Sequence, residues 1–169
     1  MSKAFTRESD DAPETPDLPP LRSALPPGAK NYLTTDGAQR LQSELDALMK
    51  QRLELASVSG TPESKSALQS LDQRIFRLQQ SLESAVVTSA PPPPWEQVRF
   101  GATVSVRNER GEVSQYRIVG VDETDVDRGW VSWLSPIARA LLNARLGQKV
   151  RFKFPDGKTQ LEITRITFD

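Results

Sequence analysis

Four consecutive prolines at residues 91–94 divide this chain of 169 residues into two parts with different hydrophobic periodicities. A run of prolines continues neither a helix nor a sheet, because proline has no backbone N–H to donate. Before the run, apolar residues recur every three or four positions, which predicts helices. After it they alternate with polar residues, which predicts strands. We therefore expect a helical unit at 31–88, a proline-rich linker at 89–97 and a β-rich unit at 98–169.

Two apolar stripes define the helical unit. The first contains Leu41, Leu45, Leu48 and Leu55, with Arg52 in the same stripe, and the second contains Leu68, Leu71, Ile75, Leu78 and Leu82. Between them Gly60 ends one helix, while Thr61 and Pro62 are typical of an N-cap and a first helical residue. Because the connection is short, the helices are expected to pack antiparallel as a coiled-coil hairpin over about 35–86. A helix pair packed onto a globular core would show the same periodicity.

Five strands in an antiparallel sheet are expected after the linker. The apolar positions that predict them are Val104, Val106, Tyr116, Ile118, Val119, Val131, Trp133, Val150, Phe152, Phe154, Leu161, Ile163 and Ile166. One short helix interrupts the strands, with Ser135 as its N-cap and Pro136 as its first residue. The fold class is therefore α+β: a helical hairpin followed by a small sheet with one helix.

Composition excludes several kinds of site. The chain has no cysteine and no histidine, which excludes thiol catalysis, disulfides, zinc fingers and histidine-based triads. Basic and acidic residues balance at 22 each, so no overall positive charge favours nucleic acid. Residues 1–30 are rich in Pro, Asp, Glu and Ser and are predicted to be a disordered arm, either a solvated leader or a docking tail. Without a long apolar run or a signal-like leader, we expect a cytoplasmic protein that does not associate with membranes.

Four segments of the β-rich unit resemble the C-terminal domain of the GreA/GreB family of bacterial transcription factors. They are Phe100-Gly101-Ala102, Tyr116-Arg117-Ile118-Val119-Gly120, Ser135-Pro136-Ile137-Ala138-Arg139-Ala140-Leu141 and Pro155-Asp156-Gly157, in family order and with near-family spacing. Lys30-Asn31-Tyr32-Leu33-Thr34, after an acidic leader that contains prolines, resembles GreB-type proteins. The resemblance implies an FKBP-like sheet domain, and RNA polymerase, bound at its secondary channel, as the partner.

The predicted tip of the hairpin departs from the family pattern. Family members carry two acidic residues there, in a Gly-Asp-x-x-Glu-Asn context, which help to hold the catalytic magnesium and to activate water. Here the tip offers Ser59, Gly60 and Glu63, with Glu54 further back on the first helix. The hairpin is also shorter than the family pattern by about 14 residues, which withdraws the tip by roughly 10 Å at 1.5 Å per residue. In length it is similar to Rnk-type regulators. We therefore expect a polymerase-binding regulator that needs no cofactor or metal, is not an enzyme and does not stimulate transcript cleavage.

A second departure concerns docking. GreB-type factors contact the polymerase through a Ser-x-Asp-x-Pro pattern, and the matching positions here are Ser132, Leu134 and Pro136. The resemblance therefore implies a polymerase-binding surface that consists of Ser132, Trp133, Leu134, Pro136 and Ile137. Leu134 is either exposed on this surface or buried in the domain. Because residues three apart face opposite sides of a regular strand, one of Trp130 and Trp133 is expected to be exposed.

Other functions stay open. One is a cleavage-competent factor in which Glu63 or Glu54 supplies a carboxylate. Another is an FKBP-like scaffold or isomerase, for which the candidate pocket aromatics are Phe100, Tyr116, Phe152 and Phe154. The chain is expected to be a monomer.

Nucleic-acid contacts are expected to be indirect. A basic run that comprises Arg139, Arg145, Lys149, Arg151 and Lys153 has no interleaved aromatic surface, so no sequence-specific DNA binding is expected. Contact with transcript RNA depends on entry of the hairpin into the channel. The side chains in question are Lys50, Arg52, Lys65, Arg74 and Arg77.

Overall fold

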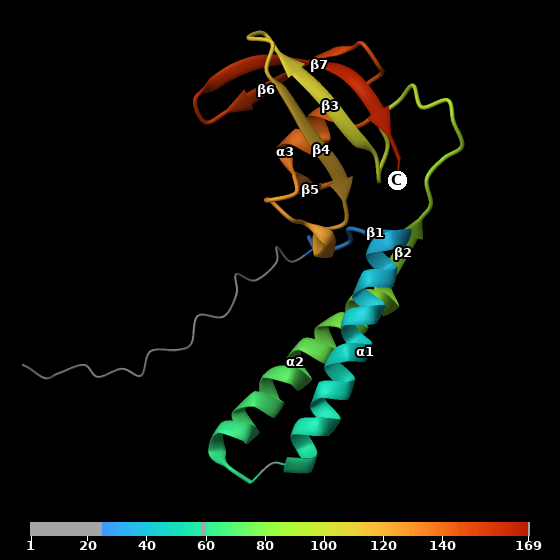
Figure 1. Ribbon diagram of the computed structural model, residues 1–169. Helices are drawn as coiled ribbons and strands as arrows, with labels where there is room; N and C mark the ends of the chain where they lie inside the picture. Colours follow the sequence, from blue (N-terminus) through green and yellow to red (C-terminus); the bar gives the residue numbers. More distant parts are fainter. Residues whose placement is uncertain (1–24, 59, 169) are drawn as a thin grey trace, which may run out of the picture.

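The computed structural model describes residues 25–58 and 60–168, so residues 1–24 of the predicted arm lie outside the described part. A hairpin of two helices, α1 (Thr35–Val58) and α2 (Pro62–Ser84), projects from a curled sheet (Figure 1). The predicted hairpin and the α+β class are thereby confirmed. Thr61 is the N-cap of α2, and its hydroxyl accepts a hydrogen bond from the Ser64 N–H at 3.2 Å. Pro62 is the first helical residue, as its fixed φ favours.

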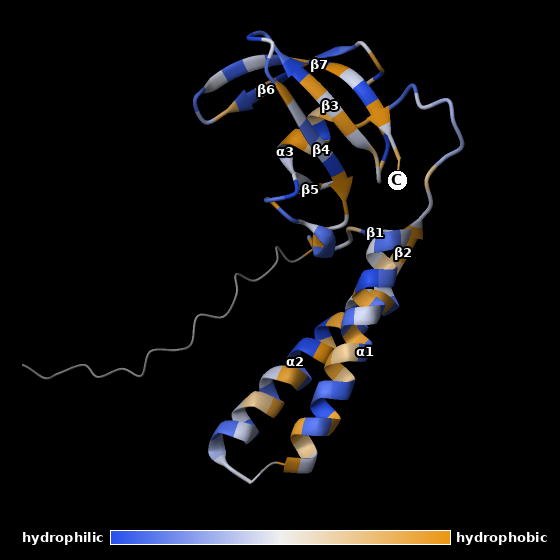
Figure 2. Cartoon of the chain, in the orientation of Figure 1, coloured by the Kyte–Doolittle hydropathy of each residue, from blue (hydrophilic) through white to orange (hydrophobic). Residues whose placement is uncertain are grey.

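The two apolar stripes meet in the hairpin seam, but burial falls along it. Close to the sheet, Leu45 and Leu48 of α1 pack with Ile75 and Leu78 of α2, and all four are buried. Towards the tip, the seam residue Leu55 is only half-buried. Figure 2 shows the apolar positions of both helices along the hairpin. The seam is therefore well packed at its base and thinly packed at its far end.

A short parallel strand pair, which the sequence did not predict, forms the base of the hairpin. Strand β1 (Asn31–Thr34) pairs with β2 (Ala85–Thr88), with Asn31 opposite Ala85 and Thr34 opposite Thr88. Since β1 and β2 run in the same direction while α1 and α2 run in opposite directions, the chain reverses sharply where β1 meets α1. This reversal lies at Thr34 and Thr35, next to the β-rich unit at 98–169, which we call the sheet unit.

The sheet has five strands in the order β5-β4-β3-β7-β6. Their bounds are β3 (Thr103–Asn108), β4 (Val113–Val119), β5 (Trp130–Ser132), β6 (Lys149–Phe154) and β7 (Gly157–Thr167). The expectation of a wholly antiparallel sheet is wrong at one edge, because β5 pairs with β4 in parallel. A 3-10 turn, η1 (Val121–Glu123), and the loop after it carry the chain back, so β5 can run beside β4 in the same direction.

The core of the sheet unit lies between the inner face of the sheet and α3 (Pro136–Leu141). Val104, Ile118 and Ile163 from three strands are fully buried there with Leu141 of α3. The buried positions of β7 do not keep a strict period of two, because a bulge opposite Ser105 and Val106 shifts the register. Among residues 25–58 and 60–168, no helix is long and apolar enough to cross a membrane.

Candidate functional site

Residues 132–137, the candidate docking segment, form the turn between β5 and α3. The Ser132 hydroxyl accepts a hydrogen bond from the Leu134 N–H at 3.1 Å, and the Ser132 carbonyl accepts one from the Ser135 N–H at 2.8 Å. Ser135 is the N-cap of α3, as predicted, and its hydroxyl accepts a hydrogen bond from Ala138 N–H at 3.3 Å. These local hydrogen bonds fix the backbone of the segment.

The five predicted binding residues differ in exposure. Pro136 is exposed, while Ser132, Trp133 and Leu134 are half-buried and Ile137 is 9% exposed within the core. Leu134 thus takes neither of the two extremes considered from the sequence. The accessible surface of the candidate docking segment therefore includes Pro136 and the outer parts of Leu134 and Ser132, while Ile137 lies beneath it in the core.

Trp130 and Trp133 are both half-buried. The expectation that one of these two side chains is exposed is therefore wrong. The strand ends at Ser132, and Trp133 therefore does not follow strand alternation. The Trp133 ring packs edge-on against Tyr32 of β1, with ring centroids 5.2 Å apart. Its buried indole N–H has no hydrogen-bond partner within the described residues. Trp133 therefore joins the candidate docking segment to the base of the hairpin.

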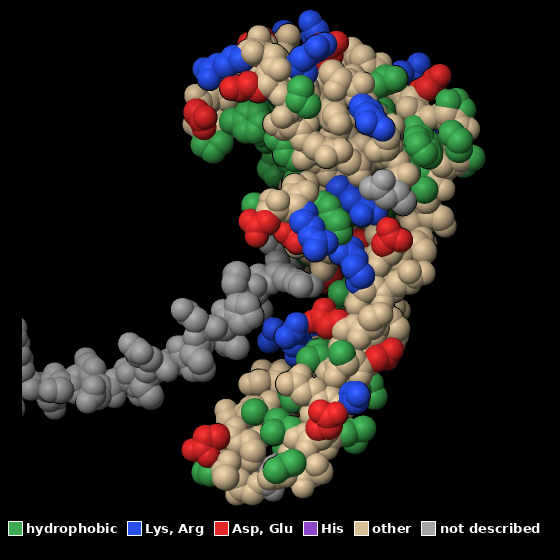
Figure 3. Space-filling view, viewed as in Figure 1, with side chains coloured by type: hydrophobic (Ala, Val, Ile, Leu, Met, Phe, Trp, Pro, Cys, Tyr) green, Lys and Arg blue, Asp and Glu red, His purple; other side chains and the backbone are tan. Residues whose placement is uncertain are grey.

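Trp130 lies in a cluster of three arginines. The guanidinium carbons of Arg40, Arg117 and Arg128 lie 4.4, 5.0 and 5.1 Å from its ring centroid, a geometry that cation–π attraction favours. Figure 3 shows Lys and Arg side chains gathered where the hairpin meets the sheet unit.

Each of these arginines also has a carboxylate partner. Asp36 lies 3.2 Å from Arg117, Glu123 lies 3.5 Å from Arg40, and Asp125 lies 3.4 Å from Arg128. The positive and negative charges are therefore equal in number. We conclude that this cluster holds the two units together and does not present a positively charged surface.

Glu123 is the buried centre of the junction between hairpin and sheet unit. Its carboxylate accepts hydrogen bonds from the backbone N–H groups of Thr34 and Gly120, each at 2.9 Å, and from the Thr34 hydroxyl. That hydroxyl in turn accepts a hydrogen bond from the Gly37 N–H at 2.9 Å, as an N-cap does. A carboxylate beside the N-terminus of α1 is also favoured by the helix dipole. We call Thr34, Gly37, Arg40, Gly120 and Glu123 the junction cluster.

Two glycines make room for this carboxylate. A Cβ atom on Gly37 would lie 1.8 Å from Glu123 Oε1, and one on Gly120 would lie 2.1 Å from the Tyr32 carbonyl oxygen. Neither position can therefore carry a side chain without displacing its neighbours. The sequence analysis named Gly120 only as part of a family-like segment and found neither Gly37 nor Glu123. A glycine in the first turn of a helix was the available signal, since glycine disfavours helices unless close packing requires it.

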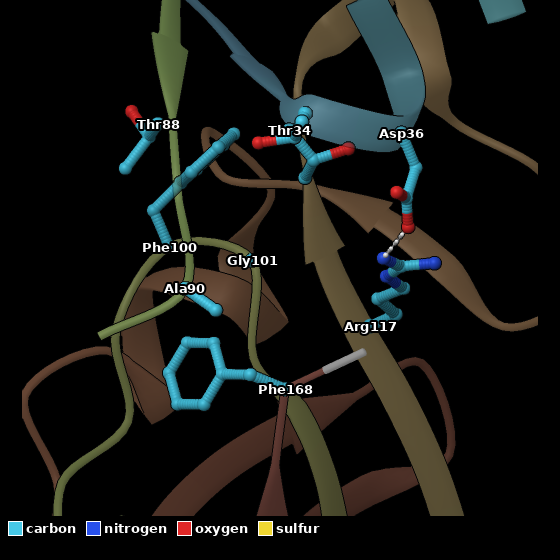
Figure 4. Close-up of a pocket in the computed structure, with 9 residues that line it drawn as sticks. Thr34, Asp36, Thr88, Ala90, Phe100, Gly101, Arg117 and Phe168 are labelled. Atoms are coloured by element: carbon cyan, nitrogen blue, oxygen red, sulfur yellow. Dashed lines mark hydrogen bonds and ion pairs between the residues drawn. The ribbon is translucent and has the colours of Figure 1, made fainter. Parts of the chain in front are cut away.

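A small cavity lies beside the junction cluster (Figure 4). Its volume is about 20 Å³, room for roughly one water molecule. The residues that line it are Thr34, Thr35, Asp36, Thr88, Ala90, Phe100, Gly101, Arg117 and Phe168. Asp36 and Arg117 form their ion pair at its edge. The cavity is too small for an organic substrate.

The hairpin tip holds little that could bind a metal. Gly60 and Glu63 are exposed, and Ser59 lies outside the described residues. Glu63 lies in the first turn of α2, where the helix dipole favours an acidic side chain. In the described part of the chain, no group of three or more His, Cys, Asp or Glu residues could hold a metal ion.

Two of the five hairpin basic residues are engaged in ion pairs across the hairpin. Arg52 pairs with Asp72, and Arg74 pairs with Glu44. The hydrogen bond to Asp72, together with the attraction of its charge, raises the pKa of Arg52 above its ordinary value. Lys50, Lys65 and Arg77 are exposed.

The aromatic residues considered for an isomerase pocket are distributed over the core. Phe152 and Phe154 contact each other edge-on with centroids 4.6 Å apart, and Phe100 packs against Tyr32 with centroids 5.6 Å apart. Together with Tyr116 they lie partly buried against the core cluster. They fill the core and do not line one common pocket.

Comparison with known proteins decides the family. The model of the C-terminal domain of the transcription elongation factors GreA/GreB matches residues 92–168. The transcription elongation factor GreB of Haemophilus ducreyi is 34% identical over 153 residues, which are 82% of this chain and 94% of the relative. The chain belongs to the GreA/GreB family. The GreB of Neisseria meningitidis serogroup B is also 34% identical, over 154 residues, with the same coverage.

Solved structures of GreA/GreB-type factors align with the chain as well. The GreA factor homolog 1 protein of Thermus thermophilus is 22% identical, with a TM-score of 0.40, and covers 82% of this chain and 99% of its own. The transcription elongation factor GreA/GreB from Nitrosomonas europaea is 22% identical, with a TM-score of 0.42, and covers 82% and 100%.

Proposed function

We propose that this GreA/GreB-family chain binds RNA polymerase at its secondary channel and regulates transcription without stimulating transcript cleavage. The candidate docking segment would contact the polymerase outside the channel, and the hairpin would point into it. Membership of the family supports the partner. The Trp133–Tyr32 contact and the junction cluster support a defined direction of the hairpin relative to the docking segment.

The composition of the tip carries the non-cleaving part of the proposal. Magnesium prefers several oxygen ligands, and a cleavage factor must bring carboxylates to the metal within coordination distance. Here the loop between the helices and the first turn of α2 contain Glu63 as their one carboxylate, and Glu54 lies a full turn back on α1. One exposed carboxylate is a poor replacement for a pair.

Retention on polymerase core enzyme tests the binding half. The native chain is compared with Leu134→Asp, which restores the acidic residue of the family pattern at a half-buried position. Leu146→Asp is the matched control, because Leu146 is 51% exposed and lies outside the docking segment. We expect the native chain to be retained, Leu134→Asp to be retained more tightly, and Leu146→Asp to behave like the native chain. Failure of all three to bind would contradict the proposal.

A cleavage assay on backtracked elongation complexes tests the other half. We expect the native chain to leave the rate of transcript cleavage unchanged at concentrations that saturate binding. If the native chain instead stimulates cleavage, and Glu63→Gln abolishes that stimulation, the tip supplies a catalytic carboxylate.

A further inference from the structure

The outer face of the sheet is strongly basic. Residues directly opposite each other on neighbouring strands point to the same face, and the residues between the buried positions of β3, β6 and β7 point outward. The exposed basic residues on this face are Arg107, Lys149, Arg151, Lys153, Lys158 and Arg165. Across these three strands the one acidic residue on the same face is Glu162, which pairs with Arg107 at 3.1 Å. We call these six residues the basic sheet face.

One pair of charges within this face is unfavourable for the isolated sheet, because Lys153 stands directly opposite Lys158. Lys149 stands opposite Glu162, whereas Arg151 stands opposite the neutral Gln160. Like charges on directly opposite residues destabilise a sheet. The neighbouring acidic residues Asp156, Glu109 and Glu112 lie in turns at the strand ends and not on the face. Figure 3 shows several Lys and Arg side chains over the end of the molecule that β6 and β7 form.

Protection of the sheet edge explains only part of this charge. Lysines on an edge strand discourage pairing with another sheet, and β6 is an edge strand. Arg107, however, stands where β3 is paired on both sides, opposite Val113 of β4 and Glu162 of β7. The part of β7 that carries Lys158 pairs with β6 alone, and Arg165 is paired with β3 alone. An acidic binding partner would account for the whole basic sheet face, including Arg107.

The same chain contains a segment of complementary charge. Residues 8–17 include five acidic residues and no basic residue, whereas the whole chain is neutral. The acidic segment and the basic sheet face therefore belong to the same chain. The outer face lacks exposed aromatic side chains across β3, β6 and β7, so it does not resemble a surface on which nucleic-acid bases stack.

We propose that residues 8–17 dock onto the basic sheet face of their own chain. The middle of this segment is joined to Leu25, where the described structure begins, by about a dozen residues, which span up to about 40 Å. A unit of about 75 residues is about 30 Å across, so the length of this tether is comparable with a path over the surface of the unit. A tethered segment also binds at an effective concentration in the millimolar range, which favours it over polyanions in solution.

The contact consists of exposed ion pairs and is therefore weak and sensitive to salt. A polyanion that approaches the basic sheet face must displace the segment first. The segment thus reduces non-specific binding of the sheet unit to nucleic acid, independently of how the docking segment binds polymerase.

A single spin label tests this proposal in the full chain. The chain has no cysteine, so Ser9→Cys gives one attachment site for a nitroxide within the acidic segment. We expect the label to broaden the backbone amide signals of Arg151, Lys153 and Lys158 more than those of α1 and α2. Raising the salt from about 0.15 M to about 1 M shortens the Debye length from about 8 Å to about 3 Å and should remove the effect.

Two charge variants of the labelled chain provide the comparison. The triple change Arg151→Gln, Lys153→Gln and Lys158→Gln should abolish the selective broadening. The matched triple change Lys50→Gln, Lys65→Gln and Arg77→Gln removes the same charge from exposed hairpin positions and should leave it intact.

Three results would overturn the proposal. The first is broadening that is absent, uniform or independent of salt. The second is broadening that appears equally in unlabelled chains mixed with labelled ones, which would indicate contact between copies. The third concerns a short DNA duplex. If it shifts the amide signals of the basic sheet face at the same concentration in the native chain and in a chain whose five acidic residues in 8–17 are changed to Asn or Gln, the segment does not compete with nucleic acid.

Discussion

The two ends of the hairpin are held by different interactions. At the base, buried leucines and the hydrogen bonds around Glu123 join the helices to each other and to the sheet unit. At the tip, Leu53 is 69% exposed, Val58 is 83% exposed, and the half-buried Leu55 continues the seam. The exposed Arg52–Asp72 ion pair stands where the seam has no apolar side chain.

Because of this contrast, residues at the tip can change without loss of the fold, whereas residues at the base are needed for stability. Because the tip buries little apolar surface, its residues contribute little to the free energy of unfolding. A change of tip residues, such as the loss of an acidic pair, therefore leaves the fold intact. Substitutions at the base are expected to be destabilising, because the donors around Glu123 bond to its buried carboxylate.

The largest expected effect is at Gly37. Gly37→Ala places a Cβ 1.8 Å from Glu123 Oε1 and displaces the carboxylate from its donors. We expect overpacking and the lost hydrogen bonds to lower the free energy of unfolding by about 4 kcal/mol, measured by urea denaturation. Gly60→Ala is the matched control, because nothing lies within 4 Å of its added Cβ. Equal effects of the two changes would remove the distinction between base and tip.

A leucine pair on α1 tests the seam itself. Leu45 is 7% exposed, so Leu45→Ala should lower the free energy of unfolding by about 3 kcal/mol. Leu55→Ala, at a half-buried position nearer the tip, should lower it by about 1 kcal/mol. The same denaturation curves measure both, and a larger loss at Leu55 would contradict the gradient.

A carboxylate-to-amide change at Glu123 isolates its hydrogen bonds. Glu123→Gln keeps the shape of the side chain but replaces one acceptor oxygen with a donor, which leaves a buried N–H or hydroxyl unpaired. We expect a loss of about 2 kcal/mol by thermal unfolding. For comparison, Glu112→Gln changes an exposed carboxylate in a turn and should stay within about 0.5 kcal/mol of the native chain. An unchanged melting temperature for Glu123→Gln would show that the junction cluster is not needed for stability.

The smallest effect is expected at Arg52. Arg52→Ala removes an ion pair between two exposed side chains, which solvent and salt screen strongly. Its denaturation midpoint should shift less than the midpoints of Gly37→Ala, Leu45→Ala, Leu55→Ala and Glu123→Gln, and the shift should vanish at high salt. A shift as large as that of Leu45→Ala would mean that the ion pair, and not the apolar seam, holds the helices together.

Much of this architecture was predictable from local patterns. The heptad stripes, the Thr61-Pro62 helix start and the Ser135-Pro136 helix start each depend on neighbouring residues only, and all three are confirmed. The two strands at the hairpin base were not predicted. β1 and β2 have four residues each, too few for a reliable period, and they pair across the whole hairpin.

The site was less predictable because it depends on contacts between distant segments. Glu123 is one acidic residue in an acidic stretch of sequence, and only the fold brings it to Thr34. The prediction that one of Trp130 and Trp133 is exposed assumed that both lie on one regular strand. It failed because β5 ends at Ser132, one residue before Trp133. The parallel direction of β5 is likewise set by the path of the chain through η1 and not by the residues of β5.

The position of Glu123 at the foot of the hairpin makes the junction a pivot with a long lever arm. The 24 residues of α1 extend about 36 Å at 1.5 Å per residue. A tilt of about 10° at the pivot would therefore swing the tip sideways by about 6 Å, more than the 5.4 Å of one helical turn. Small changes in the packing of one carboxylate are thus multiplied into larger displacements of the residues at the tip.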